Sequence, residues 1–302
     1  MAFQKDKIIS SFKIKNHMYI LILFLILIPF FSSQNAQILL NNNSSISLII
    51  VGKGSKPTVS SASHIKPLKI YLTGTDIEIS FTPQNNCPIN INIDSEENNI
   101  TLIFNETADD ISRLFQDLNN IKKVDFTHFK NKITKIKYIF LNCNSLEEVI
   151  MGNLDTSSVT SMAGMFQNTK ITSLDLSGIK TNKVEDMNNM FNACTNLKYL
   201  NLKNFHFSNL LNKEQMLINC QYSLIYLDIF SIKDTDIFND EFFDWVYSTN
   251  RKLIFCINKG KSPNRLYNLI NKGFILNCSY LTPEEAYVNE EKNNIYERYS
   301  YY

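Results

Sequence analysis

The stretch from Leu146 to Asn196 carries nearly the same sequence twice, and this repeat constrains the fold more than any other feature. The first copy is LEEVIMGNLDTSSVTSMAGMFQNTK, and the second, which follows at once, is ITSLDLSGIKTNKVEDMNNMFNACTN. Residues 121–145 and 197–223 fall into the same register once one residue is dropped or added. Stacked repeats build a core that grows lengthwise, so the chain of 302 residues does not have to divide into separate globular domains.

Each repeat is about 25 residues long and begins with an L-x-x-L-x-L pattern, within the leucine-rich range of roughly 20–29 residues. The first half predicts a strand whose apolar side chains form the inner face of a coil. These side chains fall into four columns: Ile121, Leu146, Ile171 and Leu197; Val124, Val149, Leu174 and Leu200; Phe126, Met151, Leu176 and Leu202; Phe129, Leu154, Ile179 and Phe205.

The second half of each repeat has apolar residues at spacings of three and four, which predicts a short helix or 3₁₀ turn facing the strands. The two central repeats supply Val159, Met162, Met165 and Phe166, then Val184, Met187, Met190 and Phe191. We interpret the methionine row as core packing. The expected fold class is an α/β repeat solenoid, a leucine-rich-repeat-like coil with one strand and one short helix or 3₁₀ turn per repeat.

The pattern predicts a cap at each end of the repeats. Short alternating apolar runs, bounded by Gly, Pro and Asn, predict a β-rich N-terminal cap over residues 37–104. The repeats occupy residues 105–232, and a mixed C-terminal cap of helix and strand follows at 233–281. Residues 282–302 lack apolar periodicity and are expected to form a mobile tail.

Residues 1–36 predict a secretory signal peptide. Four lysines precede an uninterrupted apolar run, MYILILFLILIPFF. This run is shorter than the roughly 18 residues that identify a spanning helix. The alternative is an uncleaved signal anchor, in which case the chain would contact a membrane. The expected location is therefore secreted or at the cell surface.

Secretion would place the six cysteines in an oxidising compartment. Cys256 and Cys278 each end an apolar run, as two neighbouring strands joined by a helix would place them, and we predict a disulfide between them. The remaining cysteines are Cys87, Cys143, Cys194 and Cys220, whose pairing the sequence leaves open. The last three recur at one repeat position and are interpreted as buried thiols, because their side chains should run parallel into the core.

The same compartment would make glycosylation candidates of five sequons. They lie at Asn42, Asn43, Asn99, Asn105 and Asn277.

Composition and motifs argue against several functions. The net charge is +1, and Lys and Arg are spread along the chain, so no basic patch predicts nucleic-acid binding. The four histidines are scattered, and the chain has no C-x-x-C pair and no phosphate-binding glycine loop. We therefore expect neither an enzyme nor a cofactor or metal site.

The BspA-type leucine-rich repeat of bacterial and protist surface proteins closely resembles three segments of this chain: LDTSSVTSMAGMF, LDLSGIKTNKVEDMNNMFNACTNL and LKYLNLKNF. The resemblance spans roughly residues 100–232 and includes the specific spacing V-x-x-M-x-x-M-F-x-x-C-x-x-L. It implies a solenoid with one strand per repeat, a secreted or cell-surface location, and a role in adhesion or binding.

Strand residues between the core columns are expected to face outward and form an open sheet face. We predict that its C-terminal end binds a protein or glycan partner at the cell surface, because aromatic side chains gather there and such side chains are typical of binding hot spots. The predicted face consists of Tyr199, Asn201, Lys203, Tyr226, Asp228 and Phe230. The alternative is a structural component of a secreted coat or secretory granule.

Overall fold

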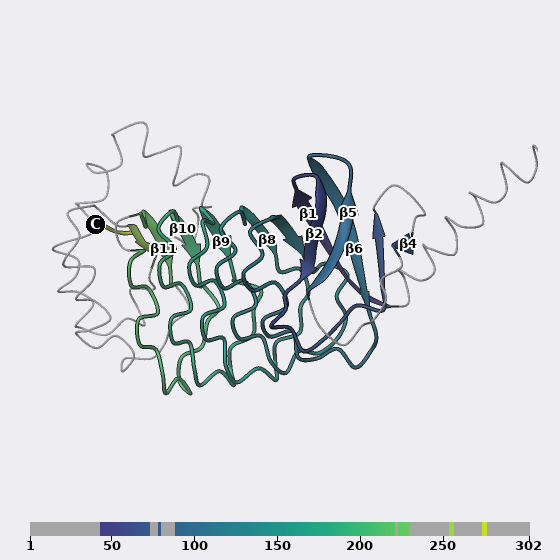
Figure 1. Cartoon of the computed structure of the whole chain (residues 1–302). Helices are drawn as coiled ribbons and strands as arrows, with labels where there is room; N and C mark the ends of the chain where they lie inside the picture. Colours follow the sequence, from purple (N-terminus) through teal and green to yellow (C-terminus); the bar gives the residue numbers. More distant parts are fainter. Residues whose placement is uncertain are drawn as a thin grey trace, which may run out of the picture.

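The computed structural model describes residues 43–72, 78–79, 88–220, 223–229, 254–256 and 274–276. Their strands and turns follow one another along a single direction, with the N-terminal strands at one end (Figure 1). The predicted signal peptide, the predicted tail and most of the predicted C-terminal cap lie outside the described residues.

The N-terminal part is made of antiparallel strands. They are β1 (Ser44–Val51), β2 (Gly54–Val59), β3 (Lys69–Leu72), β4 (Glu78–Ile79), β5 (Ile89–Ile93) and β6 (Glu97–Phe104). β1 pairs with β6 along its whole length, and β2 pairs with β5 in a separate sheet. Alternate β1 residues Ile46, Leu48 and Ile50 are buried, because one face of this sheet packs on the core.

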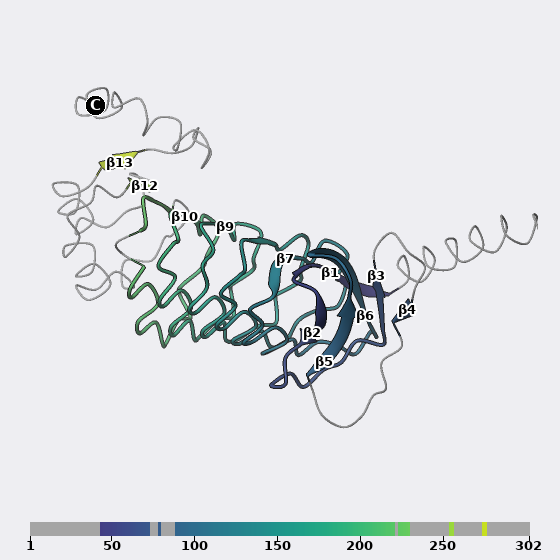
Figure 2. The same cartoon turned by 45° about the horizontal axis from the view of Figure 1, so that its top comes forward.

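β1 also joins the N-terminal strands to the repeats. Its other edge pairs antiparallel with β7 (Ile121–Asp125), which lies beside it in Figure 2. β7 then pairs in parallel with β8 (Glu148–Ile150), with Val124 opposite Val149. The resulting six-stranded sheet has the order β4-β3-β6-β1-β7-β8.

A second, five-stranded sheet begins in the later repeats and continues into the predicted C-terminal cap, and every pairing in it is parallel. Its strands are β9 (Ser173–Asp175), β10 (Tyr199–Asn201), β11 (Tyr226–Asp228), β12 (Ile254–Cys256) and β13 (Phe274–Leu276). Leu200 lies opposite Leu174 on one side and Leu227 on the other, so the predicted columns match the strand register.

The predicted α/β repeat solenoid is wrong. The described residues contain strands and turns but no helix, and the strands divide among sheets of six, five and two strands. Among the described strands, no pairing joins β8 to β9, so one sheet does not run through all the repeats. The error lies in the second half of each repeat, where apolar residues at spacings of three and four form successive turns.

Left-handed backbone prevents a helix in these turn segments. Each segment holds two residues with φ between 55° and 64°, four positions apart. The pairs are Arg113 and Asp117, Tyr138 and Asn142, Gly164 and Asn168, Asn189 and Ala193, and Gln215 and Asn219. A right-handed helix needs φ near −63°, so two left-handed residues in each segment exclude a helix there.

The turn segments exchange backbone hydrogen bonds with their neighbours in an alternating pattern. The N–H groups of Gly164 and Phe166 donate to the next repeat, at Asn188 O and Met190 O, both at 2.9 Å. The intervening N–H of Met165 donates within its own segment, to Met162 O at 3.3 Å. Adjacent repeats are therefore joined by backbone hydrogen bonds on the turn side as well as through the strands.

Apolar side chains fill the space between the strands and the turn segments. The four columns are buried apart from Val149, which is half-buried, and Met162, Met165, Met187 and Met190 are at most 1% exposed. The prediction that the methionines belong to the core is confirmed. Phenylalanine rings also stack from one repeat to the next: Phe115 on Phe140 at 5.8 Å, Phe140 on Phe166 at 5.3 Å and Phe166 on Phe191 at 5.9 Å between centroids.

Candidate functional site

The parallel register brings the described residues of the predicted face together. Tyr199 lies opposite Ser173 and Tyr226, and Asn201 lies opposite Asp175 and Asp228. The rings of Tyr199 and Tyr226 are 6.5 Å apart between centroids. Phe230 lies outside the described residues.

The expectation that this end of the face is open to solvent is wrong for β11. Tyr226 is 1% exposed and Asp228 is 5% exposed, whereas Tyr199, Asn201 and Lys203 are half-buried. The hydroxyl of Tyr226 donates to Asp228 Oδ2 at 3.4 Å. Burial and the carboxylate of Asp228 raise the pKa of Tyr226. Tyr226 and Asp228 thus form a buried polar pair and do not belong to an open face.

Three aspartate and asparagine side chains of the face shape the turns that end the strands. Each accepts a hydrogen bond from the backbone N–H two residues later: Asp125 from Thr127 at 2.8 Å, Asp175 from Ser177 at 2.8 Å and Asn201 from Lys203 at 3.0 Å. The sequence analysis missed this Asx-turn role, although Asp or Asn at the end of a short strand indicates it. The Asn201 turn holds the Lys203 backbone in place at the end of β10.

Ion pairs join the first strands of the face. Lys123 and Glu148 lie 2.8 Å apart across β7 and β8. Next to Lys123 in β7, the Lys122 ammonium lies 3.3 Å from Glu97 and 3.8 Å from Glu147. The hydrogen bond to Glu97 and the charge of Glu147 raise the pKa of Lys122. The surface around β7 and β8 therefore carries both signs of charge.

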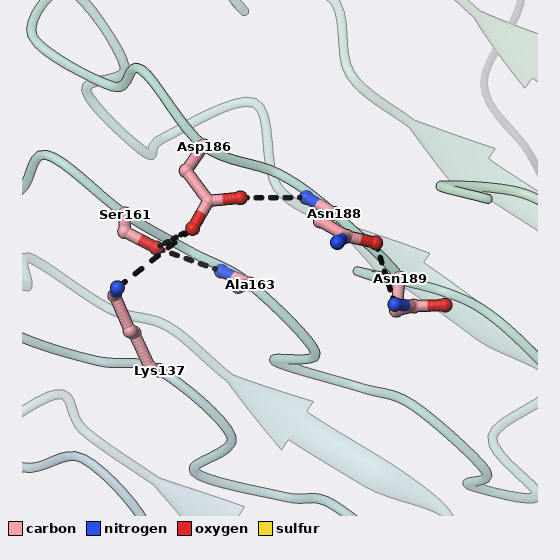
Figure 3. Close-up of polar contacts among 6 residues, drawn as sticks. All are labelled: Lys137, Ser161, Ala163, Asp186, Asn188 and Asn189. Carbon is pink, nitrogen blue, oxygen red and sulfur yellow. Dashed lines mark hydrogen bonds and ion pairs between the residues drawn. The ribbon is translucent and has the colours of Figure 1, made fainter. Parts of the chain in front are cut away.

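On the turn side, three neighbouring repeats share a polar cluster (Figure 3). Ser161 Oγ donates to Asp186 Oδ2 at 2.7 Å, the Lys137 ammonium lies 3.7 Å from the same oxygen, and the Asn188 N–H donates to Asp186 Oδ1 at 3.1 Å. Ser161 is only 6% exposed. Its hydroxyl hydrogen is bound by the Asp186 carboxylate, so Ser161 is not an exposed nucleophile. The cluster instead joins three repeats to one another.

The recurring cysteines lie in the core. Cys143, Cys194 and Cys220 are free and buried, which confirms the prediction of buried thiols. Burial raises the pKa of Cys143 to about 12 and that of Cys194 to about 11. The Cys194 thiol donates to the Phe166 carbonyl at 2.9 Å. These thiols fill space between the turn segments and lack the thiolate character of a catalytic cysteine.

The predicted disulfide falls partly outside the described residues. Cys256 is disulfide-bonded. Cys278 and Cys87 are not among the described residues, so the pairing of Cys256 with Cys278 stays a prediction.

The described sequons all lie on the N-terminal strands or just beyond them. Asn99 in β6 and Asn105 just after it are exposed, and Asn43 is half-buried before β1. Asn42 and Asn277 lie outside the described residues.

The described part of the chain lacks the features of two other classes of site. No group of three or more His, Cys, Asp or Glu residues there could hold a metal ion. The same residues include no helix long and apolar enough to cross a membrane.

Comparison with known proteins found one family model that is similar to part of the chain. The family described as DUF285, Mycoplasma protein of unknown function, matches residues 109–225. The match covers less than half of the chain and describes what this stretch is similar to. Comparison with curated proteins and with solved structures found no match. The resemblance to BspA-type repeats stays a prediction.

Proposed function

We propose that the protein is a non-enzymatic recognition protein, secreted or displayed at the cell surface. It binds a protein or glycan partner through the sheet surface that includes Tyr199, Asn201 and Lys203, which we name the strand face. The observation that carries the proposal is the parallel register that places Tyr199 between Ser173 and the buried Tyr226. A half-buried aromatic side chain supported by a second ring is the kind of anchor that binding hot spots use.

The strand face is also held in place before any partner binds. Backbone pairing fixes β10 on both edges, and the Asn201 side chain fixes the turn that follows. Preorganised contact residues lose little conformational freedom on binding, which favours affinity. The exposed residues Glu148 and Asp175 and the half-buried Lys203 give the strand face both signs of charge. Mixed charge around an aromatic anchor favours a protein partner over a neutral glycan.

Binding of purified protein to intact cells and to arrayed glycans tests the proposal. The double variant Tyr199→Ser/Lys203→Glu removes the anchor and inverts one charge. The matched control Lys183→Glu makes the same charge change at another exposed position. We expect saturable binding by the wild type, weakening of about tenfold or more in the double variant, and little change in the control. Equal binding by the double variant, or no saturable binding to either target, would contradict the proposal.

Location is tested separately from binding. Labelling of intact producing cells with a reagent that does not cross membranes should modify exposed lysines of a displayed protein. A protein found in the culture medium would agree equally with secretion. Protection of the protein inside vesicles of intact cells would favour the alternative, a structural component of a granule.

A further inference from the structure

The turn side of the repeats carries a row of amide side chains, which we name the amide ribbon. Its members are Gln116, Asn142, Gln167, Asn168, Asn189, Asn192, Gln215 and Asn219. All are half-buried or exposed, and they come from five successive turn segments. The ribbon belongs to a different side of the repeats from the strand face.

Hydrogen bonds along the ribbon orient the amide groups. Asn168 Nδ2 donates to Asn142 Oδ1 at 2.9 Å, and Asn142 Nδ2 donates to Asp117 Oδ1 at 2.7 Å. Further along, Asn219 Nδ2 donates to Asn192 Oδ1 at 3.3 Å. A primary amide has two donor hydrogens and two acceptor lone pairs, so these bonds use only part of the capacity of each group.

Backbone geometry explains only some of these amides. Asn142, Asn168, Asn189 and Asn219 have left-handed backbone, which asparagine tolerates well. Gln116, Gln167 and Asn192 are not among the positive-φ residues, so their backbone would accept many side chains. The structure therefore contains more amides on this edge than its backbone requires.

The side chains of the ribbon itself are all uncharged amides. A carboxylate, Asp117, accepts hydrogen bonds at its N-terminal end, and the adjacent Arg113 donates to Gln116 Oε1 at 2.7 Å. None of the ribbon asparagines has Ser or Thr two residues later, whereas the exposed sequons Asn99 and Asn105 lie on and beside β6. N-glycosylation at these two exposed sequons would consequently attach sugar outside the ribbon.

We propose that the amide ribbon binds a neutral polysaccharide whose chain runs along the stack of repeats. Sugar hydroxyls donate and accept hydrogen bonds, as amides do, so a neutral sugar can pair with these groups without an ionic partner. Adjacent repeats are spaced as paired strands are, at about 4.8 Å, which is similar to the advance of one pyranose ring in an extended chain. One ligand would thus contact several repeats at once, and many weak contacts would add up. This site goes beyond the strand-face function and is independent of it.

Variants that keep the backbone conformation test the proposal. The triple variant Asn142→Gly/Asn168→Gly/Asn219→Gly removes three amides, and glycine accepts the left-handed backbone at each position. Ala193→Gly is the matched control, because Ala193 has the same backbone conformation but no amide. The probes are insoluble cellulose, chitin and β-1,3-glucan, with immobilised heparin as a charged comparison.

We expect the wild type and Ala193→Gly to be retained by at least one neutral polysaccharide, with retention that persists at high salt. The triple variant should lose about tenfold or more in affinity. Tyr199→Ser/Lys203→Glu should be retained like the wild type, since it changes the other surface. If the triple variant unfolds more easily, Gln167→Ala/Asn192→Ala removes amides where the backbone is ordinary and should give the same loss.

Three results would overturn the proposal. They are no retention on any neutral polysaccharide, retention on heparin alone that salt abolishes, and equal retention when either set of amides is removed. Failure here would leave the strand-face proposal untouched, because the two are tested by different variants.

Discussion

The ring of Tyr138 packs against Gly164 of the next repeat so closely that a Cβ at Gly164 would lie 2.3 Å from the ring carbon Cδ1. The guanidinium of Arg113, one repeat earlier, lies 4.6 Å from the centre of the same ring. Arg113, Tyr138 and Gly164 are the first left-handed residues of their turn segments. One aromatic side chain thus links three repeats on the turn side.

This contact predicts that the effect of a methyl group at Gly164 depends on Tyr138. Gly164→Ala should lower the free energy of unfolding by about 1–3 kcal/mol, from left-handed strain and from crowding against the ring. In a Tyr138→Ala background the crowding disappears, so the cost should fall by about 1 kcal/mol. Urea unfolding of the four proteins in this double-mutant cycle measures the difference. An identical cost in both backgrounds would mean that the ring does not limit the space at Gly164.

Gly152 is expected to be the less tolerant glycine because backbone faces it. Its φ is +55°, and a Cβ there would lie 2.6 Å from the Cα of Thr127. Gly152→Ala should therefore lower the free energy of unfolding by about 2–4 kcal/mol. Gly178→Ala is the control, since its Cβ would approach only Gly152 O at 3.9 Å, and its effect should stay within about 0.5 kcal/mol. Equal effects in the same urea titrations would refute this account.

Ala193 is the alanine among the left-handed positions of the turn segments, with φ of 61°. Replacement by glycine relieves about 1–2 kcal/mol of strain but increases the freedom of the unfolded chain, so Ala193→Gly should stabilise the protein by up to about 1 kcal/mol. Ala163→Gly, in a turn segment but not among the positive-φ residues, should destabilise it by about 0.4–1 kcal/mol. Differential scanning calorimetry should show opposite shifts in Tm, and shifts of the same sign would contradict the strain argument.

The buried thiols predict a loss of stability at alkaline pH. Burial raises the pKa of Cys143 from 9.0 to about 12, so above pH 9 the unfolded chain releases a proton that the folded chain retains. The free energy of unfolding should therefore decrease as the pH rises from 9 toward 12. Cys143→Thr should weaken this dependence, and threonine is already present at the equivalent Thr169. An unchanged slope in urea titrations across this pH range would contradict the prediction.

The burial of Tyr226 predicts that it supports the strand face structurally. Tyr226→Ser should lower the free energy of unfolding by about 3 kcal/mol or more, because it empties a fully buried site. Tyr226→Phe should cost only about 1 kcal/mol, for the hydrogen bond to Asp228. Tyr199→Ser, at a half-buried position, should cost less than Tyr226→Ser. Thermal unfolding of the three variants gives the order, and a Tyr226→Ser protein as stable as the wild type would show that the site is not packed.

Much of the repeat architecture could be predicted because it depends on recurrence. The columns of Leu174 and Leu200, the buried methionines and the buried Cys194 all follow from residues that return at one interval. The predicted helix was wrong because successive turns and a helix both bury apolar residues at spacings of three and four. Gly164 and Asn168 could have distinguished turns from a helix, since both residue types tolerate left-handed backbone.

The candidate surfaces were harder to predict. Lys137 and Asp186 pair across an intervening repeat, and the amides of Asn142 and Asn168 meet only when neighbouring repeats stack. Tyr226 and Tyr199 occupy the same position in the strand pattern, yet Tyr226 is buried and Tyr199 is half-buried. This difference in exposure depends on the surroundings of each strand.

Local pattern and recurrence in the amino-acid sequence establish which residues pair in register and which side chains enter the core, because a repeated interval admits few consistent alignments. The hand of the backbone at Arg113, Tyr138 and Ala193, and the burial of Tyr226, follow from packing between repeats. Side chains of these types do not favour left-handed backbone on their own, so contacts and hydrogen bonds from adjacent repeats must stabilise it. The stacking of repeats likewise brings together the residues of the strand face, through strand pairing, and those of the amide ribbon, through the turns.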